Sequence, residues 1–267
     1  MEIQDVVKEI KQSFRLMMDG AVAQSMRDKG LNYHLNWGAT IPRLQAKAEE
    51  IRLRVKGEGF TVNGSSTSEA TKSMTGLRVQ DPLELRSLSK REIIKFRSSS
   101  ARSQGEKSQS SNFKVQSSKL AIELWKENVR ECKILATMLM PPDEILPEVV
   151  DIWQEQIPSQ EIAEQLAFNL YQHLPFAAEK AYQWIASDKE YDQLCGFHVL
   201  SRLFMNGQEP NERGINEFLD QALCALQGPY PSVRKAALQS LQRFAELGIL
   251  YERLAKSATK SIDLDIF

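Results

Sequence analysis

Cys195 and His198 are the residues whose types most directly suggest chemistry, because a thiolate beside an imidazole can act as a nucleophile. They lie three residues apart in an apolar stretch that predicts a helix, and side chains at that spacing rarely aim at each other. A nucleophilic pair also needs a third group that orients the histidine. We therefore predict that both residues belong to the core.

The other two cysteines, Cys132 and Cys224, also lie in apolar helical patterns. Three widely spaced cysteines favour reduced, buried thiols over a disulfide framework, and a cytoplasmic location. The close Cys/His pairs of a zinc site are absent from the sequence, as are a glycine-rich phosphate loop and a catalytic-triad signature. We expect no metal and no cofactor.

Aromatic side chains that could stack on a nucleobase are the tryptophans Trp37, Trp125, Trp153 and Trp184. The last three have helical core spacing, so we predict that they pack inside the protein. Trp37 lies in a connector rich in glycine and asparagine. At this position its side chain can either pack in the core or contact a ligand. It is a candidate for nucleic-acid binding.

Charged candidates fall into two groups. Cations that could contact phosphate from one concave surface, or form the solvated flanks of a repeat protein, are Arg43, Arg130, Lys133, Arg234 and Lys235. Glu161 and Glu164 are weak candidates for a catalytic carboxylate. Such residues more often simply begin a helix, where the dipole favours acids, so a structural role is the favoured interpretation.

The elements that must position these residues are helices. Apolar residues recur at three- and four-residue intervals over 2–18, from about residue 42, and repeatedly from 119 to 260, with prolines and glycines between the segments. Helices of this length joined by short turns favour antiparallel hairpins, and a period of about 30–40 residues is typical of HEAT-like stacks. The predicted fold class is all-α, a HEAT-like α-solenoid over 1–50 and 119–260.

A long polar insertion interrupts this pattern at 51–118, which contains 15 serines. Residues 52–55 and 60–62 suggest a small hairpin, and 83–96 a short helix. Residues 98–118 have too little apolar area to offset chain entropy, so we predict disorder there. Residues 261–267 form a C-terminal tail. No apolar run reaches the roughly 18 residues that span a bilayer, and the charged N-terminus does not resemble a signal peptide.

Several stretches resemble the DNA alkylation repair family, the AlkD-like glycosylases built from HEAT-like repeats. The stretches are residues 37–44, residues 124–125 followed by 130–136, residues 184–188, and residues 232–238. The resemblance implies a concave basic groove that holds damaged duplex DNA. It also implies tryptophans and an aspartate against the lesion, where aromatic faces and a carboxylate stabilise a departing cationic base.

The sequence departs from that pattern at the expected lesion site. Residues 158–163 contain neither the tryptophan nor the aspartate, and the expected arginine and aromatic positions fall near Leu194, Gln239 and Gln242. The helical part carries a net charge of −8 and the insertion +7, although duplex binding relies on cations. We therefore predict that the glycosylase chemistry is lost.

The leading functional prediction is a binding or scaffold protein that uses its concave face, with duplex DNA or a protein as the partner. Two alternatives stay open: an active DNA glycosylase that excises alkylated bases, and a non-catalytic protein that binds nucleic acid through the basic insertion.

Overall fold

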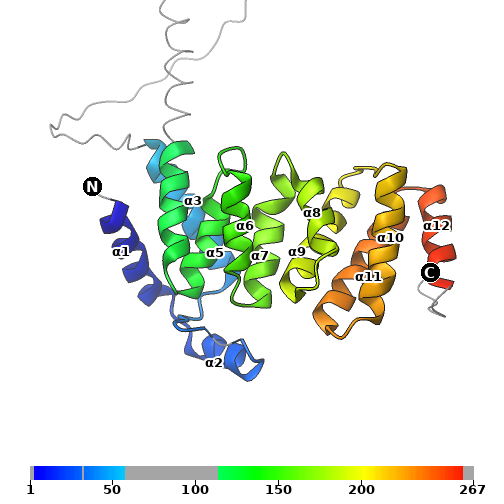
Figure 1. Ribbon diagram of the computed structural model, residues 1–267. Coiled ribbons are helices and arrows are strands. Elements are labelled where there is room, and N and C mark those ends of the chain that lie inside the picture. Colours follow the sequence, from blue (N-terminus) through cyan, green and yellow to red (C-terminus); the bar gives the residue numbers. More distant parts are fainter. Residues whose placement is uncertain (1–2, 32, 58–113, 261–267) are drawn as a thin grey trace, which may run out of the picture.

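The computed structural model describes residues 3–31, 33–57 and 114–260, and the regular elements of these residues are all helices. Figure 1 shows them stacked side by side in a row, with the two termini at opposite ends and α2 projecting from the row. The prediction of an all-α fold is confirmed.

The elements follow one another in a single series. They are α1 (Ile3–Phe14), η1 (Arg15–Met17), α2 (Gly20–Asp28), α3 (Ile41–Gly57), a helix over 114–126, α5 (Arg130–Leu139), α6 (Pro147–Glu155), α7 (Gln160–Asn169), η3 (Tyr171–His173), α8 (Ala177–Ile185), α9 (Glu190–Met205), α10 (Glu212–Gln227), α11 (Pro231–Ala245) and α12 (Ile249–Lys260).

Local sequence explains several helix starts. Pro147 and Pro231 occupy the first turns of α6 and α11, where a missing N–H costs nothing and the fixed φ is already helical. Asp19 and Asn211 cap α2 and α10, because their side-chain oxygens accept hydrogen bonds from the free N–H groups of the first turn.

The helices form two rows. In one row α3, α5, α7, α9 and α11 pack each against the next, and in the other row α8 and α10 pack against their partners α9 and α11. We refer to the solvent-exposed surface of the first row, formed by α3, α5, α7, α9 and α11, as the second-helix face. A continuous core lies between the rows. It contains the three tryptophans predicted to be buried, with Trp125 and Trp153 stacked at 4.4 Å between ring centroids.

Three predictions about the insertion need correction. Residues 52–55 are the end of α3 and not a strand, because Ile51 and Val55 are buried one helical turn apart. Helix α3 also continues to Gly57, beyond the boundary predicted at residue 50. Residues 114–118, predicted to be disordered, begin the next helix and bury Ser117. The hairpin strand at 60–62, the helix at 83–96 and the tail at 261–267 lie outside the described residues.

The connector that leads into α3, residues 33–40, is fixed by contacts with distant parts of the chain. Leu35 forms a parallel bridge with Val129, and the Trp37 carbonyl accepts a hydrogen bond from the Asp19 N–H at 3.0 Å. Gly38 has a φ of +75°, and a Cβ there would lie 2.1 Å from the Asp19 carbonyl oxygen. Only glycine fits this turn, which brings the connector against the start of α5.

Candidate nucleic-acid interface

Arg130 and Glu161, two of the candidates from the sequence, form one buried ion pair. Arg130 begins α5 and Glu161 lies in the first turn of α7, so the packing of α5 on α7 brings them together. The guanidinium binds the carboxylate through two bonds, Nε to Oε2 at 2.8 Å and Nη2 to Oε1 at 2.6 Å. The Arg130 side chain is 0% exposed and the Glu161 side chain 16%.

The connector closes over this pair. The Tyr33 hydroxyl donates to Glu161 Oε2 at 2.5 Å and lies 2.8 Å from the Ser159 hydroxyl. Arg130 Nη1 donates to the Ala39 carbonyl at 2.7 Å. Every polar atom of the Arg130 guanidinium is therefore directed at a group within the chain.

Glu131, the next residue on α5, holds the same connector from its other side. Its Oε1 accepts hydrogen bonds from the backbone N–H groups of Trp37 at 3.0 Å and Ala39 at 3.3 Å, and it lies 3.3 Å from Arg130 Nη1. Glu131 is completely buried, and its Oε2 has no hydrogen-bond partner among the described residues. We call Tyr33, Arg130, Glu131 and Glu161 the buried network.

The electrostatics of the buried network keep Glu161 ionised. Burial raises the pKa of Glu161, but the hydrogen bonds and charge of Arg130, with the hydrogen bond from Tyr33, outweigh burial and hold that pKa below its usual range. Burial and the neighbouring carboxylate raise the pKa of Tyr33. The lone pairs of Glu161 are thus directed at partners within the chain, which suits a structural role.

The expectation that Arg130 and Lys133 are solvent-facing cations is wrong. Lys133 is buried on α5, where its Nζ donates to the Trp125 carbonyl at 2.9 Å and lies 4.3 Å from the centroid of the Trp125 ring. Burial lowers the pKa of Lys133. Both cations hold helices together and are covered from any phosphate.

The remaining sequence candidates are dispersed. Arg43 is exposed on α3 and donates to the Met17 carbonyl at 3.3 Å, and Arg234 donates to the Gly228 carbonyl at 2.6 Å. Lys235 is exposed on α11. Glu164 is half-buried on α7 and accepts a hydrogen bond from Gln160 at 2.8 Å. Trp37 is half-buried and packs against the core.

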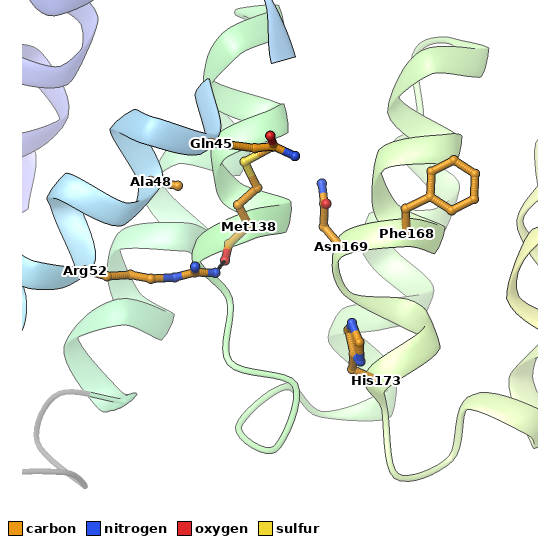
Figure 2. Close-up of a pocket in the computed structure, with 7 residues that line it drawn as sticks. All are labelled: Gln45, Ala48, Arg52, Met138, Phe168, Asn169 and His173. Atoms are coloured by element: carbon orange, nitrogen blue, oxygen red, sulfur yellow. Dashed lines mark hydrogen bonds between the residues drawn. The ribbon is translucent and has the colours of Figure 1, made fainter. Parts of the chain in front are cut away.

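A groove of about 230 Å³ opens on the second-helix face between α3, α5 and α7. Its lining residues are Gln45, Ala48, Arg52, Met138, Phe168, Asn169 and His173. Figure 2 shows Gln45 and Asn169 facing each other across the groove, with Arg52 and His173 below them. The lining combines one guanidinium, one imidazole and two amides with apolar surface, and it contains no carboxylate.

Phe168 connects this groove to α9. The Arg202 guanidinium lies 4.7 Å from the centroid of the Phe168 ring, and the His198 ring meets Phe168 edge-on at 4.9 Å. Burial, with the charges of Arg202 and Lys235, lowers the pKa of His198 to about 4. Arg52, Arg202 and Lys235 thus place cations along the second-helix face from α3 to α11.

The chain matches the family model described as "DNA alkylation repair enzyme" over residues 98–246, which is more than half of its 267 residues. It belongs to the DNA alkylation repair enzyme family. It is also similar to a solved structure described as "a new family of proteins related to the HEAT-like repeat DNA glycosylases with affinity for branched DNA structures", with a TM-score of 0.63 and 13% identity over 95% of this chain and 81% of that one. This likeness confirms the HEAT-like fold. A comparison with curated proteins finds no match.

In this DNA alkylation repair family member, Cys195 and His198 are both buried, as predicted. Cys195 Sγ lies 3.4 Å from the Ala163 carbonyl, and burial raises the pKa of this thiol. The prediction that all three cysteines are buried is wrong for Cys224, which is exposed on α10. No group of three or more His, Cys, Asp and Glu residues that could hold a metal occurs among the residues described. Within the same residues, no helix is long and apolar enough to cross a membrane.

Sequence reasoning missed the groove of this family member. Gln45, Arg52, Asn169 and His173 are polar residues on helices or turns, and nothing in their spacing distinguishes them from an ordinary solvated surface. Phe168 fits the apolar pattern of its own helix.

Proposed function

We propose that this protein binds DNA through its second-helix face and does not excise alkylated bases. The observation that carries the proposal is the lining of the groove, which offers one guanidinium, one imidazole, two amides and a phenylalanine but no carboxylate. Such groups suit phosphates and bases, whereas excision of an alkylated base needs a negative charge close to the sugar as the base departs.

Three features support DNA as the partner. The cations Arg52, Arg202 and Lys235 lie on the second-helix face, one each on α3, α9 and α11. Phosphate contacts of this kind provide most of the affinity of non-specific DNA binding. The family assignment and the affinity for branched DNA named for the structural neighbour point to the same class of partner.

Two features support the loss of excision. In the segment where the family resemblance expects a tryptophan and an aspartate, Glu161 is bound on both oxygens by Arg130 and on one by Tyr33. Glu164, one turn before Phe168 on the same side of α7, is the remaining candidate, and it lies outside the groove lining. An active glycosylase would have to act through Glu164 or an equivalent carboxylate.

The experiment measures the affinity of labelled duplex DNA by fluorescence anisotropy between about 50 and 200 mM salt. Replacing a cation that binds phosphate should weaken DNA binding. It should also reduce the steepness of the slope of log K against log salt concentration by about one for each phosphate that is no longer neutralised. We expect this for Arg202→Gln. Arg43→Gln is the matched control, because Arg43 lies half a turn away from the groove-lining side of α3.

Equal losses of affinity for Arg202→Gln and Arg43→Gln would contradict binding through the second-helix face. Salt-independent or undetectable binding to DNA would contradict DNA as the partner and favour a protein on that face. Binding that survives both substitutions but disappears when residues 58–113 are deleted would support the basic insertion instead.

A further inference from the structure

We propose that a pocket between α8 and α10 binds a basic segment of a protein partner, one that carries several lysine or arginine side chains. The pocket lies in the row of helices that contains α8 and α10, and not on the second-helix face. These two helices contact each other there, and the turn from α9 to α10 completes the lining. The inference concerns a second ligand and does not depend on the proposed DNA binding.

Carboxylates predominate among the charged groups of this pocket. Glu179 on α8, Glu209 in the turn and Glu217 on α10 line it, against the single guanidinium of Arg213 among the lining residues described. None of the three carboxylates forms an ion pair with another residue that the structure describes. The pocket therefore has an excess of negative charge that a cationic ligand would balance.

Hydrogen bonds hold two of these carboxylates in place and still leave them able to accept. Glu209 accepts from the Tyr251 hydroxyl at 3.0 Å, and Glu217 accepts from Gln221 Nε2 at 3.2 Å. Each contact uses one carboxylate oxygen, Oε2 of Glu209 and Oε1 of Glu217. The other oxygen of each is available to an ammonium or guanidinium group, which forms strong hydrogen bonds with an ionised acceptor.

Tyr182 joins the two helices and shapes the pocket. Its hydroxyl donates to the Gly214 carbonyl at 3.1 Å, so its ring spans the space between α8 and α10. Gly214 permits this approach, because a Cβ there would lie 2.9 Å from the Tyr182 hydroxyl oxygen. Burial, and then the charge of Glu217, raises the pKa of Tyr182 to about 12. Ala178 and Pro210 add apolar surface, against which the aliphatic stem of a lysine or arginine can pack.

Side-chain amides favour a peptide over a small organic cation. Gln183 on α8 and Gln208 in the turn line the pocket, and both are exposed. An amide both donates and accepts hydrogen bonds, which matches the N–H and C=O groups of a peptide backbone. A polyamine in its ionised form offers donors alone. An extended segment with cationic side chains therefore matches the amides as well as the carboxylates.

The charge of the surrounding elements favours the same ligand. Residues 177–185 and 206–227, which form α8, the turn and α10, contain five Asp/Glu against two Lys/Arg. One of the two cations, Lys180, is paired with Asp151 at 2.5 Å. The cations proposed to contact DNA lie on the second-helix face instead. A basic segment is therefore attracted to the pocket, whereas DNA is repelled from it.

The test uses two fluorescein-labelled peptides of equal length, made of glycine and serine with either three arginines or three glutamines. Anisotropy titrations with the full-length protein at a fixed salt concentration give the two affinities. We expect the arginine peptide to bind roughly tenfold more tightly, from several cation–carboxylate pairs together. Glu217→Gln should weaken its binding about fourfold and Glu179→Gln about twofold, because Glu217 is half-buried and Glu179 is exposed.

Two further variants separate the pocket from the overall charge of the protein. Glu148→Gln is the matched control, because Glu148 is an exposed carboxylate on α6 outside the pocket lining. It should change the affinity less than about 1.5-fold, since salt screens distant exposed charges. Arg213→Gln removes the cation of the described lining and should strengthen binding about twofold, a gain that partial unfolding cannot produce.

A preference for the arginine peptide that Glu217→Gln reduces, Arg213→Gln increases and Glu148→Gln leaves unchanged would support the pocket. Equal losses for Glu217→Gln and Glu148→Gln, or equal binding of both peptides by the natural protein, would overturn it. Competition with spermidine distinguishes a protein segment from a free polyamine. Displacement by spermidine at or below the concentration at which the unlabelled arginine peptide displaces would overturn a protein segment as the ligand. Failure of DNA binding would leave all these results unaffected, because the peptides test a different surface.

Discussion

Replacing Glu161 by glutamine should destabilise the fold much more than replacing its neighbour Glu164. The substitution removes the charge that compensates Arg130, whose side chain is 0% exposed and cannot reach water. Breaking a buried ion pair by removing one partner costs about 3–5 kcal/mol. We expect the lower end, about 3 kcal/mol, because Glu131 stays 3.3 Å from Arg130 and Glu161 is 16% exposed.

Urea and thermal unfolding, followed by helical circular dichroism, measure this effect. For a protein of this size a loss of about 3 kcal/mol corresponds to a fall in Tm of roughly 6–12 °C. Glu164→Gln, on the same helix and hydrogen-bonded to Gln160 at a half-buried position, should change the free energy of unfolding by less than about 0.5 kcal/mol. A similarly small change for Glu161→Gln would refute the structural role of the buried network.

Two further predictions concern titration and reactivity. Burial lowers the pKa of His198 to about 4 in the folded protein, whereas the pKa of an unperturbed histidine in the unfolded chain is about 6.5, so the free energy of unfolding should fall by about 2 kcal/mol from pH 7 to 5. Urea unfolding at both pH values should show that this fall is absent in His198→Gln, and an equal fall there would count against the buried, neutral histidine. Cys224 should be the one cysteine of the native protein alkylated rapidly by iodoacetamide, because Cys132 and Cys195 are buried. Peptide mass spectrometry locates the label, and early labelling of Cys195 would contradict the burial described.

The helical architecture could be predicted because its signals are local. Val6, Val7, Ile10 and Phe14 of α1 repeat at helical spacing and are buried, and Pro231 marks the start of α11. The strand prediction for 52–55 is wrong because arginines that alternate with Leu53 and Val55 fit a strand as well as a helix. The burial of this segment is set by Ile51 and Val55 on one helical face, which becomes evident only over a longer window.

The candidate site was harder to predict because it depends on contacts between distant residues. Arg130 has the composition of a surface cation, and its burial requires both Glu161 on α7 and the connector that covers it, some 31 and 91 residues away in sequence. The groove likewise arises where α3, α5, α7 and η3 meet, so no single segment encodes it. The departure at residues 158–163 from the family pattern was visible in the sequence, but the engagement of Glu161 there was not.

Release of alkylated bases is the measurement that tests the central proposal most directly. Protein in excess is incubated with duplex DNA that contains N3-methyladenine or N7-methylguanine, under conditions where anisotropy shows that the DNA is bound. We predict that free base appears no faster than in DNA without protein. Release well above that rate, abolished in Glu164→Gln and kept in a folded Arg43→Gln control, would contradict the proposal and identify an active glycosylase.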